Sequence, residues 1–481
     1  MQMQCSHVLS PSVAKLGRLT EESVVCTSAD SGFGLIWCNS MRPTNAADSV
    51  LRNLELLGCV FEFQDGFYED CLLFQHLNPA SDEYKALTRY YLVGDCLSLG
   101  HVDTTLVPIF ERLNIVLAPW YAAYGTSRLV RLIASMEYMR LMVLTHATYY
   151  GLLDVLVLLD AATTTIKHEH MHFDVPHLID LAALNGQLRT IEFLHTHDTS
   201  TASKDAMDLA SRNGHLDVVR FLHFNRREGC SPHAIVLAAA NGHLNVVQFL
   251  HRFRGERHSD AFVSAAANGH LAVVKYLHDN NMPGCSTLAM DLAARAGHLS
   301  VVEFLHHHRK EGCTTSAMDV AARNGHLNVV QFLHDHRTEG CTTLAMDGAI
   351  SNGHLEVVRF LHERRTEGCT KYAMDNAAQN GFLDIVRYLH EHRKEGCTTS
   401  AMDRAASCGH LDIVQFLDQH RTEGCSPRAM EMAARKGHLE VVKYLAIHRH
   451  EGNLESSILH AKQNHHTSIV AFLQTRLALP P

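Results

Sequence analysis

The chain has 481 residues, of which 46% are apolar and 19% charged, and its formal net charge is −9. This composition predicts a globular protein, because disordered chains are poorer in apolar and richer in charged residues. The acidic balance argues against a nucleic-acid binder that relies on a basic surface.

The beginning of the chain shows no targeting signal. The stretch MQMQCSHVLSPSVAKLGRL lacks a charged start followed by an apolar run, so no signal peptide is expected. The longest uncharged segments, residues 113–127 and 141–153, are shorter than the roughly 20 residues of a membrane helix. The 14 cysteines contain no C-x-x-C pair, and such pairs are a strong sign of zinc or redox chemistry. We therefore expect an intracellular protein, cytoplasmic or nuclear, with reduced thiols and no membrane span.

Residues 1–95 show no internal repeat, and the sequence assigns them no fold. In residues 96–178, the phrases around Gly100 and Gly151 echo the later repeats out of phase. We interpret this second region as divergent or capping helical repeats, because the end units of a repeat array need a modified face. A separate helical adaptor domain is the alternative.

From residue 179 to about 475 the sequence repeats itself. A glycine followed by His-Leu or a close variant recurs every 28 residues, with one interval of 27, at Gly214, Gly242, Gly269, Gly297, Gly325, Gly353, Gly381, Gly409 and Gly437. Gly186 extends the series upstream, and His465 takes the glycine position downstream. The series predicts 11 units, and periods of this length are typical of helical solenoids.

Each unit is predicted to form two helices. A hydroxyl residue opens the first helix as an N-cap, at Ser231, Ser286, Thr314, Thr342, Thr370, Thr398 and Ser426, and proline follows the first and last of these. The first helix runs through AMDVAARN and ends at Gly325. The second begins at HLNVVQFLH and carries an apolar stripe of Leu327, Val330, Phe332 and Leu333. Gly340 is predicted to end it as the C′ residue. Stacking on adjacent units should bury the stripe.

The phrase AARNGHLNVVQFL resembles the ankyrin repeat, whose consensus runs Thr-Pro-Leu-His-x-Ala-Ala-x-x-Gly-His-Leu-x-Val-Val-x-x-Leu-Leu. The resemblance covers about 300 residues and recurs at least ten times. It implies an all-α, ankyrin-type solenoid of about 11 or more helix-turn-helix repeats, whose family role is protein binding without catalysis.

The repeats also depart from the family pattern. Their period of 28 residues is shorter than the family's roughly 33, and turns such as TEGC are too short for the projecting β-hairpin of the family. The Thr-Pro-Leu-His tetrad becomes SAMD or LAMD, so aspartates replace its histidine at Asp319, Asp347, Asp375 and Asp403. The hydrogen bond of that histidine and the fingertip mode of binding are therefore not carried over.

Without hairpins, the candidate binding surface moves to the exposed end of the first helix. This position follows the Ala-Ala pair and varies between repeats, as Arg212, Arg295, Arg323, Ser351, Gln379, Ser407 and Arg435. In proteins with the same repeat this end lines the concave side. Plain solvent exposure with tolerated variation is the alternative for each residue.

The repeated cysteines and histidines are interpreted as structural. One cysteine per unit, at Cys230, Cys285, Cys313, Cys341, Cys369, Cys397 and Cys425, places neighbours roughly 8–10 Å apart, too far for disulfides. Histidines open the second helix at His326, His354 and His410, and others follow the Phe-Leu or Tyr-Leu pair at His306, His334, His362 and His390. A third set lies two residues further, at His308, His336 and His392, where the spacing does not suit chelation by one helix.

One histidine cluster departs from the register: His168, His170, His172 and His177 in KHEHMHFDVPH. No cysteine or fixed spacing supports a metal site there, so a solvated loop is expected. The sequence contains neither a phosphate-binding glycine loop nor a G-x-S-x-G or H-E-x-x-H motif. We predict no catalytic residues, no cofactor and no metal.

The sequence therefore predicts a non-catalytic protein–protein interaction scaffold, monomeric, that binds a partner protein along one face of the solenoid. The first alternative is an adaptor or substrate-receptor subunit, for example of a ubiquitin ligase, whose residues 1–95 dock an enzyme. A second is an enzyme whose active site lies in that N-terminal part.

Overall fold

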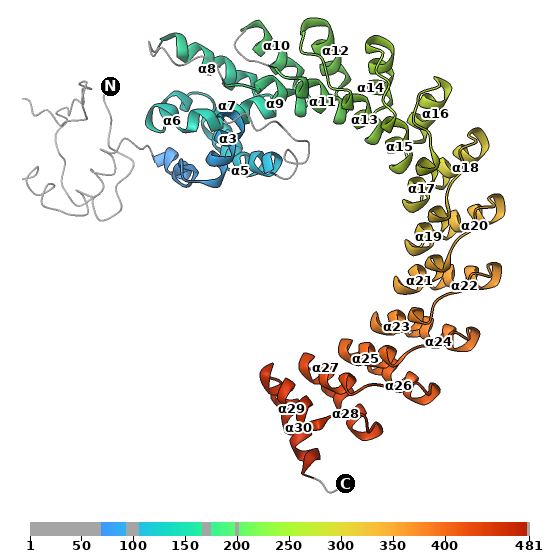
Figure 1. Ribbon diagram of the computed structural model, residues 1–481. Helices are drawn as coiled ribbons and strands as arrows, with labels where there is room; N and C mark the ends of the chain where they lie inside the picture. Colours follow the sequence, from blue (N-terminus) through green and yellow to red (C-terminus); the bar gives the residue numbers. More distant parts are fainter. Residues whose placement is uncertain (1–68, 93–104, 166–174, 198–201, 479–481) are drawn as a thin grey trace, which may run out of the picture. The chain divides into compact units, whose positions relative to one another are not determined.

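A computed structural model of the chain describes residues 69–92, 105–165, 175–197 and 202–478 (Figure 1). Every regular element in these ranges is a helix, which confirms the all-α prediction. None of the described helices is both long and apolar enough to cross a membrane. The chain divides into two compact units, Met1–Pro176 and His177–Pro481.

The described part of the first unit contains a 3-10 helix and five α-helices. They are η1 (Glu69–Leu77), α3 (Asp82–Leu92), α5 (Val107–Tyr124), α6 (Leu129–Ser135), α7 (Met139–Tyr150) and α8 (Leu153–Thr165). Their largely aliphatic core contains two aromatic contacts: the Phe74 ring meets Trp120 edge-on at 5.6 Å, and Phe110 stacks on Tyr149 at 4.6 Å.

The pair α7 and α8 has the local geometry of a repeat. Gly151 ends α7 in the left-handed conformation, and the Leu152 N–H donates to Ala147 O at 2.9 Å. The interpretation of residues 96–178 as divergent or capping repeats stays a proposal that this turn supports. The expected boundary near residue 95 and the phrase at Gly100 lie outside the described residues.

The described part of the second unit contains 11 helix pairs, as the sequence predicted. The first helices of the pairs are α9 (Leu178–Leu184), α11 (Lys204–Arg212), α13 (His233–Ala240), α15 (Asp260–Ala267), α17 (Thr287–Arg295), α19 (Thr315–Arg323), α21 (Thr343–Ser351), α23 (Tyr372–Gln379), α25 (Thr399–Cys408), α27 (Arg428–Lys436) and α29 (Leu454–Gln463).

The second helices follow them in the same order. They are α10 (Leu188–Thr196), α12 (Leu216–Asn225), α14 (Leu244–Phe249) with a π-helical turn η3 (Leu250–Arg254), α16 (Leu271–Asp279), α18 (Leu299–His308), α20 (Leu327–His336), α22 (Leu355–Arg364), α24 (Leu383–His392), α26 (Leu411–His420), α28 (Leu439–His448) and α30 (Thr467–Leu477).

Small residues set how closely the repeats stack. Ala321 and Ala322 in α19 are fully buried, and the first helices of adjacent repeats pack more closely than the second helices do. Figure 1 shows the two kinds of helix as two rows within this unit. In α20 the buried residues are Val329, Val330 and Leu333. The predicted stripe was thus partly wrong, because Leu327 and Phe332 are only half-buried and α20 also packs on α19 of its own repeat.

Gly325 ends the first helix as predicted, and it does so for two reasons. Its φ of +80° allows the His326 N–H to donate to Ala321 O at 2.9 Å and its own N–H to reach Ala322 O, the Schellman pattern of a helix end. The His354 ring of the next repeat lies directly over this glycine, so that a Cβ there would be 2.6 Å from His354 Nδ1.

The hydroxyl caps form in some repeats only. Thr314, Thr342 and Thr398 accept the N–H two residues further on, as predicted. Ser231 and Ser426 accept the same kind of bond although proline is the N-cap residue in their repeats. Ser286 is the N-cap residue of α17 as predicted, but its side chain makes no cap hydrogen bond. The prediction was wrong for Thr370, because Lys371 is the N-cap residue of α23.

The end of the second helix also differs from the prediction. Helix α20 ends at His336, and Arg337 takes an extended conformation as the C-cap. Gly340 lies three residues beyond, with a φ of +74°, and is therefore not the C′ residue. The positive φ favours glycine at this position, and the Arg365 side chain of the next repeat lies over it, so that a Cβ would be 2.6 Å from Arg365 Nη2.

The aspartates that replace the family's histidine join adjacent repeats. The Asp319 carboxylate accepts the Thr342 N–H at 2.7 Å and the Thr342 hydroxyl at 2.8 Å, 23 residues along the chain. The same pair of hydrogen bonds links Asp180 to Ser203, Asp291 to Thr314, Asp375 to Thr398 and Asp403 to Ser426. The carboxylate thus fastens the cap of the next first helix.

Replacing Gly325 by alanine should destabilise the array more than replacing Gly255. Both glycines have positive φ, so both variants carry the backbone strain of about 1–2 kcal/mol. Only the Gly325 variant also pushes against a ring, His354, whereas nothing lies within 4 Å of a Cβ at Gly255. We expect an additional loss of about 1–3 kcal/mol in the free energy of unfolding. Urea unfolding measures it, and equal losses in the two variants would contradict the packing argument.

The Asp319→Ala variant should lose more stability than Asp347→Ala. Asp319 holds both the N–H and the hydroxyl of its threonine, whereas Asp347 accepts only the Thr370 N–H at 2.9 Å. Removing a charged acceptor from buried donors costs about 1–3 kcal/mol, and the gain in helix propensity is the same at both sites. Thermal unfolding followed by circular dichroism compares the two, and a larger loss at Asp347 would contradict this assignment.

Candidate functional site

The residues predicted to bind a partner all lie at the end of a first helix. Five are the last helical residue of α11, α17, α19, α21 and α23, and two precede the last residue of α25 and α27. Arg295, Arg323, Gln379 and Arg435 are exposed, whereas Arg212, Ser351 and Ser407 are half-buried.

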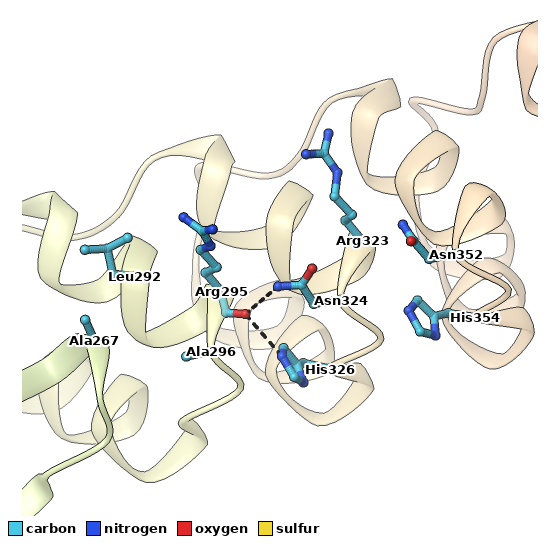
Figure 2. A pocket seen from close by; sticks show the side chains of 9 residues that line it. All are labelled: Ala267, Leu292, Arg295, Ala296, Arg323, Asn324, His326, Asn352 and His354. Atoms are coloured by element: carbon cyan, nitrogen blue, oxygen red, sulfur yellow. Dashed lines mark hydrogen bonds between the residues drawn. The ribbon is translucent and has the colours of Figure 1, made fainter. Parts of the chain in front are cut away.

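The backbone at these positions has a structural role that the sequence did not reveal. The carbonyl oxygen of Arg295 accepts Asn324 Nδ2 at 2.8 Å and lies 3.1 Å from His326 Nε2, both from the next repeat (Figure 2). Histidines of later repeats contact the carbonyl oxygens of Gln379, Ser407 and Arg435 in the same way. These contacts between repeats fix the backbone at the end of each of these first helices and leave the side chain at that position free to vary.

Arg295 and Arg323 border an open hollow between adjacent first helices. The hollow has a volume of about 650 Å³, and its other lining residues are Ala267, Leu292, Ala296, Asn324, His326, Asn352 and His354. Figure 2 shows the two arginine side chains extending on the same side. The structure thus brings two of the seven predicted residues together at one site, and the other five lie on other repeats.

Exposed apolar residues continue this surface along the first helices. In α17, exposed Leu288, half-buried Leu292 and Arg295 follow one another at spacings of four and three residues, which places them on one helix face. Leu288 is 50% exposed, and the equivalent Leu344 and Tyr372 are 53% and 55% exposed. We call the surface formed by Leu288, Leu292, Arg295, Arg323, Leu344 and Tyr372 the first-helix face. The sequence analysis missed its apolar part.

The arginines of this face differ from those of the turns. Neither Arg295 nor Arg323 forms an ion pair within the described ranges. Arg337, in the turn after α20, is bound to Glu339. Burial alone would raise the pKa of Glu339, but hydrogen bonds from Arg337 and from backbone N–H groups lower it to about 2. Equivalent pairs recur in the turns, so these arginines serve the scaffold and those of the first-helix face are free.

The repeated cysteines are packing residues, as predicted. All of them are free, and they are buried except for Cys285 and Cys397, which are half-buried. Burial raises the pKa of Cys313 and Cys369 to about 12, so these thiols stay protonated and poorly reactive near neutral pH. They offer no nucleophile.

The histidines after the Phe-Leu pair form ring contacts between repeats. Phe332 stacks on His336 at 4.4 Å within α20, while His306 of the preceding repeat meets the Phe332 ring edge-on at 5.5 Å. His336 Nδ1 also contacts Phe332 O at 3.0 Å at the end of its helix. The predicted structural role in packing and turn bonding is confirmed for this set.

The structure gathers no metal ligands in the part it describes. No group of three or more His, Cys, Asp or Glu side chains there could hold an ion. His168, His170 and His172 of the irregular cluster lie outside the described residues. His177 is described, and its Nδ1 lies 2.9 Å from a carboxylate oxygen of Asp180, which raises the pKa of His177.

These observations define a helical-repeat array with an exposed face on its first helices. A family model for ankyrin repeats, in three copies, matches residues 235–314, 290–375 and 348–430. Residues 235–430 are therefore ankyrin repeats, a class of module that generally mediates protein–protein interactions and is typically non-catalytic. No curated protein matches the chain.

The His306→Asp variant should shift the pH dependence of the array's stability. Burial lowers the pKa of His306, and the neighbouring His307, Arg337 and His336 lower it further, against an opposing effect of Glu339. The folded array therefore binds this proton less tightly than the unfolded chain, so that His306 stabilises above about pH 6.5 and this contribution is lost as the pH falls. In another repeat Asp418 occupies this position and pairs with Arg449 at 2.9 Å.

The corresponding aspartate at position 306 should pair with Arg337 and lose its contribution only below about pH 4. The melting temperature of the variant should fall less than that of the native chain between about pH 7.5 and 5.5. His450→Asp, at an exposed position in a turn of another repeat, serves as the control. Identical pH dependence of the native chain and the His306 variant would contradict the assignment.

Proposed function

We propose that the protein is a non-catalytic scaffold that binds a partner protein along the first-helix face. The observation that carries this proposal is the pair of unpaired guanidinium groups, Arg295 and Arg323, beside an open hollow that half-buried Leu292 lines, with exposed Leu288 one helical turn away on the same helix. A surface that combines large apolar side chains with unpaired arginines has the composition typical of protein interfaces.

The partner chemistry follows from the same residues. Free guanidinium groups favour carboxylates, which they can bind through two parallel hydrogen bonds, and the leucines favour an apolar side chain beside them. The segment bound here therefore presents acidic and apolar groups together. Nucleic acid is disfavoured because the chain as a whole carries a charge of −9.

The joints between repeats make the surface suitable for binding. Helix α21, for example, is held at its start by Asp319, which binds Thr342, and at its end by Asn380 of the next repeat, which donates to Ser351 O at 2.8 Å. A preformed surface loses little conformational entropy when a partner docks. We further propose that the protein acts as a monomer inside the cell, where free cysteines such as Cys313 and Cys341 persist.

Reversing the charge of Arg295, Arg323 and Arg435 together should abolish capture of the natural partner. The three side chains are exposed, so the substitution to glutamate should leave the circular dichroism spectrum unchanged while repelling an acidic segment. Capture from the native cell by the tagged full chain, quantified by mass spectrometry, measures the effect.

The matched control reverses three exposed arginines of the second helices, Arg359, Arg364 and Arg387. Both variants change the net charge equally, so a loss confined to the first-helix variant supports the proposed face. Partners that are captured equally by the native chain and the first-helix variant would overturn the proposal.

A further inference from the structure

Two phenylalanines are exposed on adjacent second helices. Phe224 in α12 is 64% exposed and Phe253 in η3 is 58% exposed. The repeat around Gly325 has polar residues in the same register, Asp335 for Phe224 and His336 for Phe253. Exposing two large aromatic side chains to water is unfavourable, and neither is needed to build the repeat, because other repeats form without them.

The two phenylalanines belong to one aromatic cluster that spans two repeats. Their ring centroids lie 6.4 Å apart, and each also contacts Phe249, which is only 5% exposed. Phe253 stacks on Phe249 at 4.8 Å, so its ring is held in place from below. The exposed rings thus form a supported apolar surface, and their positions are fixed before any partner arrives.

The backbone changes at the same place. The other second helices on either side, α12 and α16, are regular, whereas α14 passes into the π-helical turn η3 and ends at Gly255 with a φ of +67°. Single π-helical turns often occur at functional sites. This repeat is also the one followed by an interval of 27 residues in place of 28.

Three unpaired arginines lie close to the two phenylalanines in the sequence. Arg220 precedes Phe224 by one helical turn, Arg252 is adjacent to Phe253, and Arg227 follows α12; all three are exposed. None of the three forms an ion pair with a described residue, whereas the neighbouring Arg226 is bound to Glu228. Residues 216–257 contain six arginines and three acidic residues in a chain whose net charge is −9. The positive charge is therefore local.

We propose that Phe224, Phe253, Arg220, Arg227 and Arg252, here called the aromatic–arginine patch, form a second docking surface that binds an acidic peptide segment of a partner protein. The segment carries a large apolar side chain among its carboxylates: the apolar group packs on the two rings, and the carboxylates pair with the guanidinium groups. This surface lies on the second helices and does not depend on the first-helix face.

Charge complementarity favours a short acidic peptide over other anionic partners. Duplex DNA carries one charge about every 1.7 Å along its axis, so it would extend from this local patch onto repeats that belong to an acidic chain. A membrane surface is a broad anionic plane, and it would meet the same obstacle. A peptide segment can place a few carboxylates over three arginines and end there.

The test measures binding of a fluorescent synthetic peptide to the full-length protein by fluorescence anisotropy. The peptide alternates aspartate and glutamate with leucine and phenylalanine. One control peptide has lysine in place of the acidic residues, and another has serine in place of the apolar residues. We expect saturable binding of the first peptide, and at least about tenfold weaker binding of either control.

The protein variants use residues that other repeats already contain, so the fold is expected to persist. The phenylalanine variant, Phe224→Asp with Phe253→His, introduces the residues that the repeat around Gly325 has at the equivalent positions, Asp335 and His336. The arginine variant, Arg220→Gln with Arg227→Thr, likewise introduces the equivalents of Gln331 and Thr338. The phenylalanine variant should weaken peptide binding by at least about tenfold. The arginine variant should weaken it and reduce its dependence on salt concentration. Arg359→Gln with Arg387→Gln on α22 and α24 is the matched control and should bind normally.

Equal affinity of the native chain and the phenylalanine variant overturns the proposal, as does equal binding of the acidic and lysine peptides. Phosphatidylserine vesicles and a single-stranded oligonucleotide are tested in the same way. If either binds the native chain but not the phenylalanine variant, and the peptide does not bind, the patch recognises a membrane or nucleic acid and the proposal is overturned. Self-association in sedimentation velocity that only the phenylalanine variant abolishes points to a second copy instead.

The two proposed surfaces fail separately in this design. Because the first-helix face also favours acidic and apolar groups, the phenylalanine substitutions are tested again in the Arg295, Arg323 and Arg435 charge-reversal variant, where peptide binding to the aromatic–arginine patch should persist and should be lost when Phe224 and Phe253 are replaced. If that variant alone loses the peptide, the first-helix face is the site and the aromatic–arginine patch is not. If the charge-reversal variant still binds the peptide and still captures the natural partners, the aromatic–arginine patch is supported and the proposal of the first-helix face is overturned.

Discussion

The contact between a histidine of one repeat and the glycine of the repeat before it holds the array together. The His326 ring lies over Gly297, where a Cβ would be 2.6 Å from Nδ1, and His326 Nε2 reaches the carbonyl oxygen of Arg295 at 3.1 Å. Several first helices are also held at the opposite end by the aspartate link, as α21 is where Asp319 binds Thr342. The side chains that project from the first helices are therefore presented on a backbone with little freedom to rearrange.

Periodicity in the sequence predicted the helix pairs, the left-handed glycine at Gly325 and the buried alanines, because each depends on local conformation or on a spacing within one unit. It did not predict the partner of Asp319, since in a strict repeat every position recurs at the same interval and the period cannot show which positions touch. Gly340 was misassigned for a related reason. A positive φ suits both a helix end and a close approach by Arg365, and only the structure shows that the second applies.

The candidate surface was predictable in position but not in character. The ends of the first helices could be located from the Ala-Ala-x-x-Gly phrase, and the variation there between repeats indicated exposure. Leu288 and Leu344 were missed because an apolar residue in a helix is more often part of the core, and nothing in the sequence shows that the first turn of this helix is open to solvent. The hollow beside Arg295 requires two neighbouring repeats and does not exist within one.

A repeat protein offers its own comparison for deciding which deviations matter. Exposed positions vary among polar residues without any change in the backbone, as Thr338 and Lys394 do in equivalent turns, and such variation needs no functional explanation. Phe253 differs, because an exposed aromatic ring, a π-helical turn and an unpaired arginine at position 252 coincide there. Each of these features is unfavourable or neutral for the stability of the array. Their coincidence is accounted for by binding, which gains from apolar area and free positive charge.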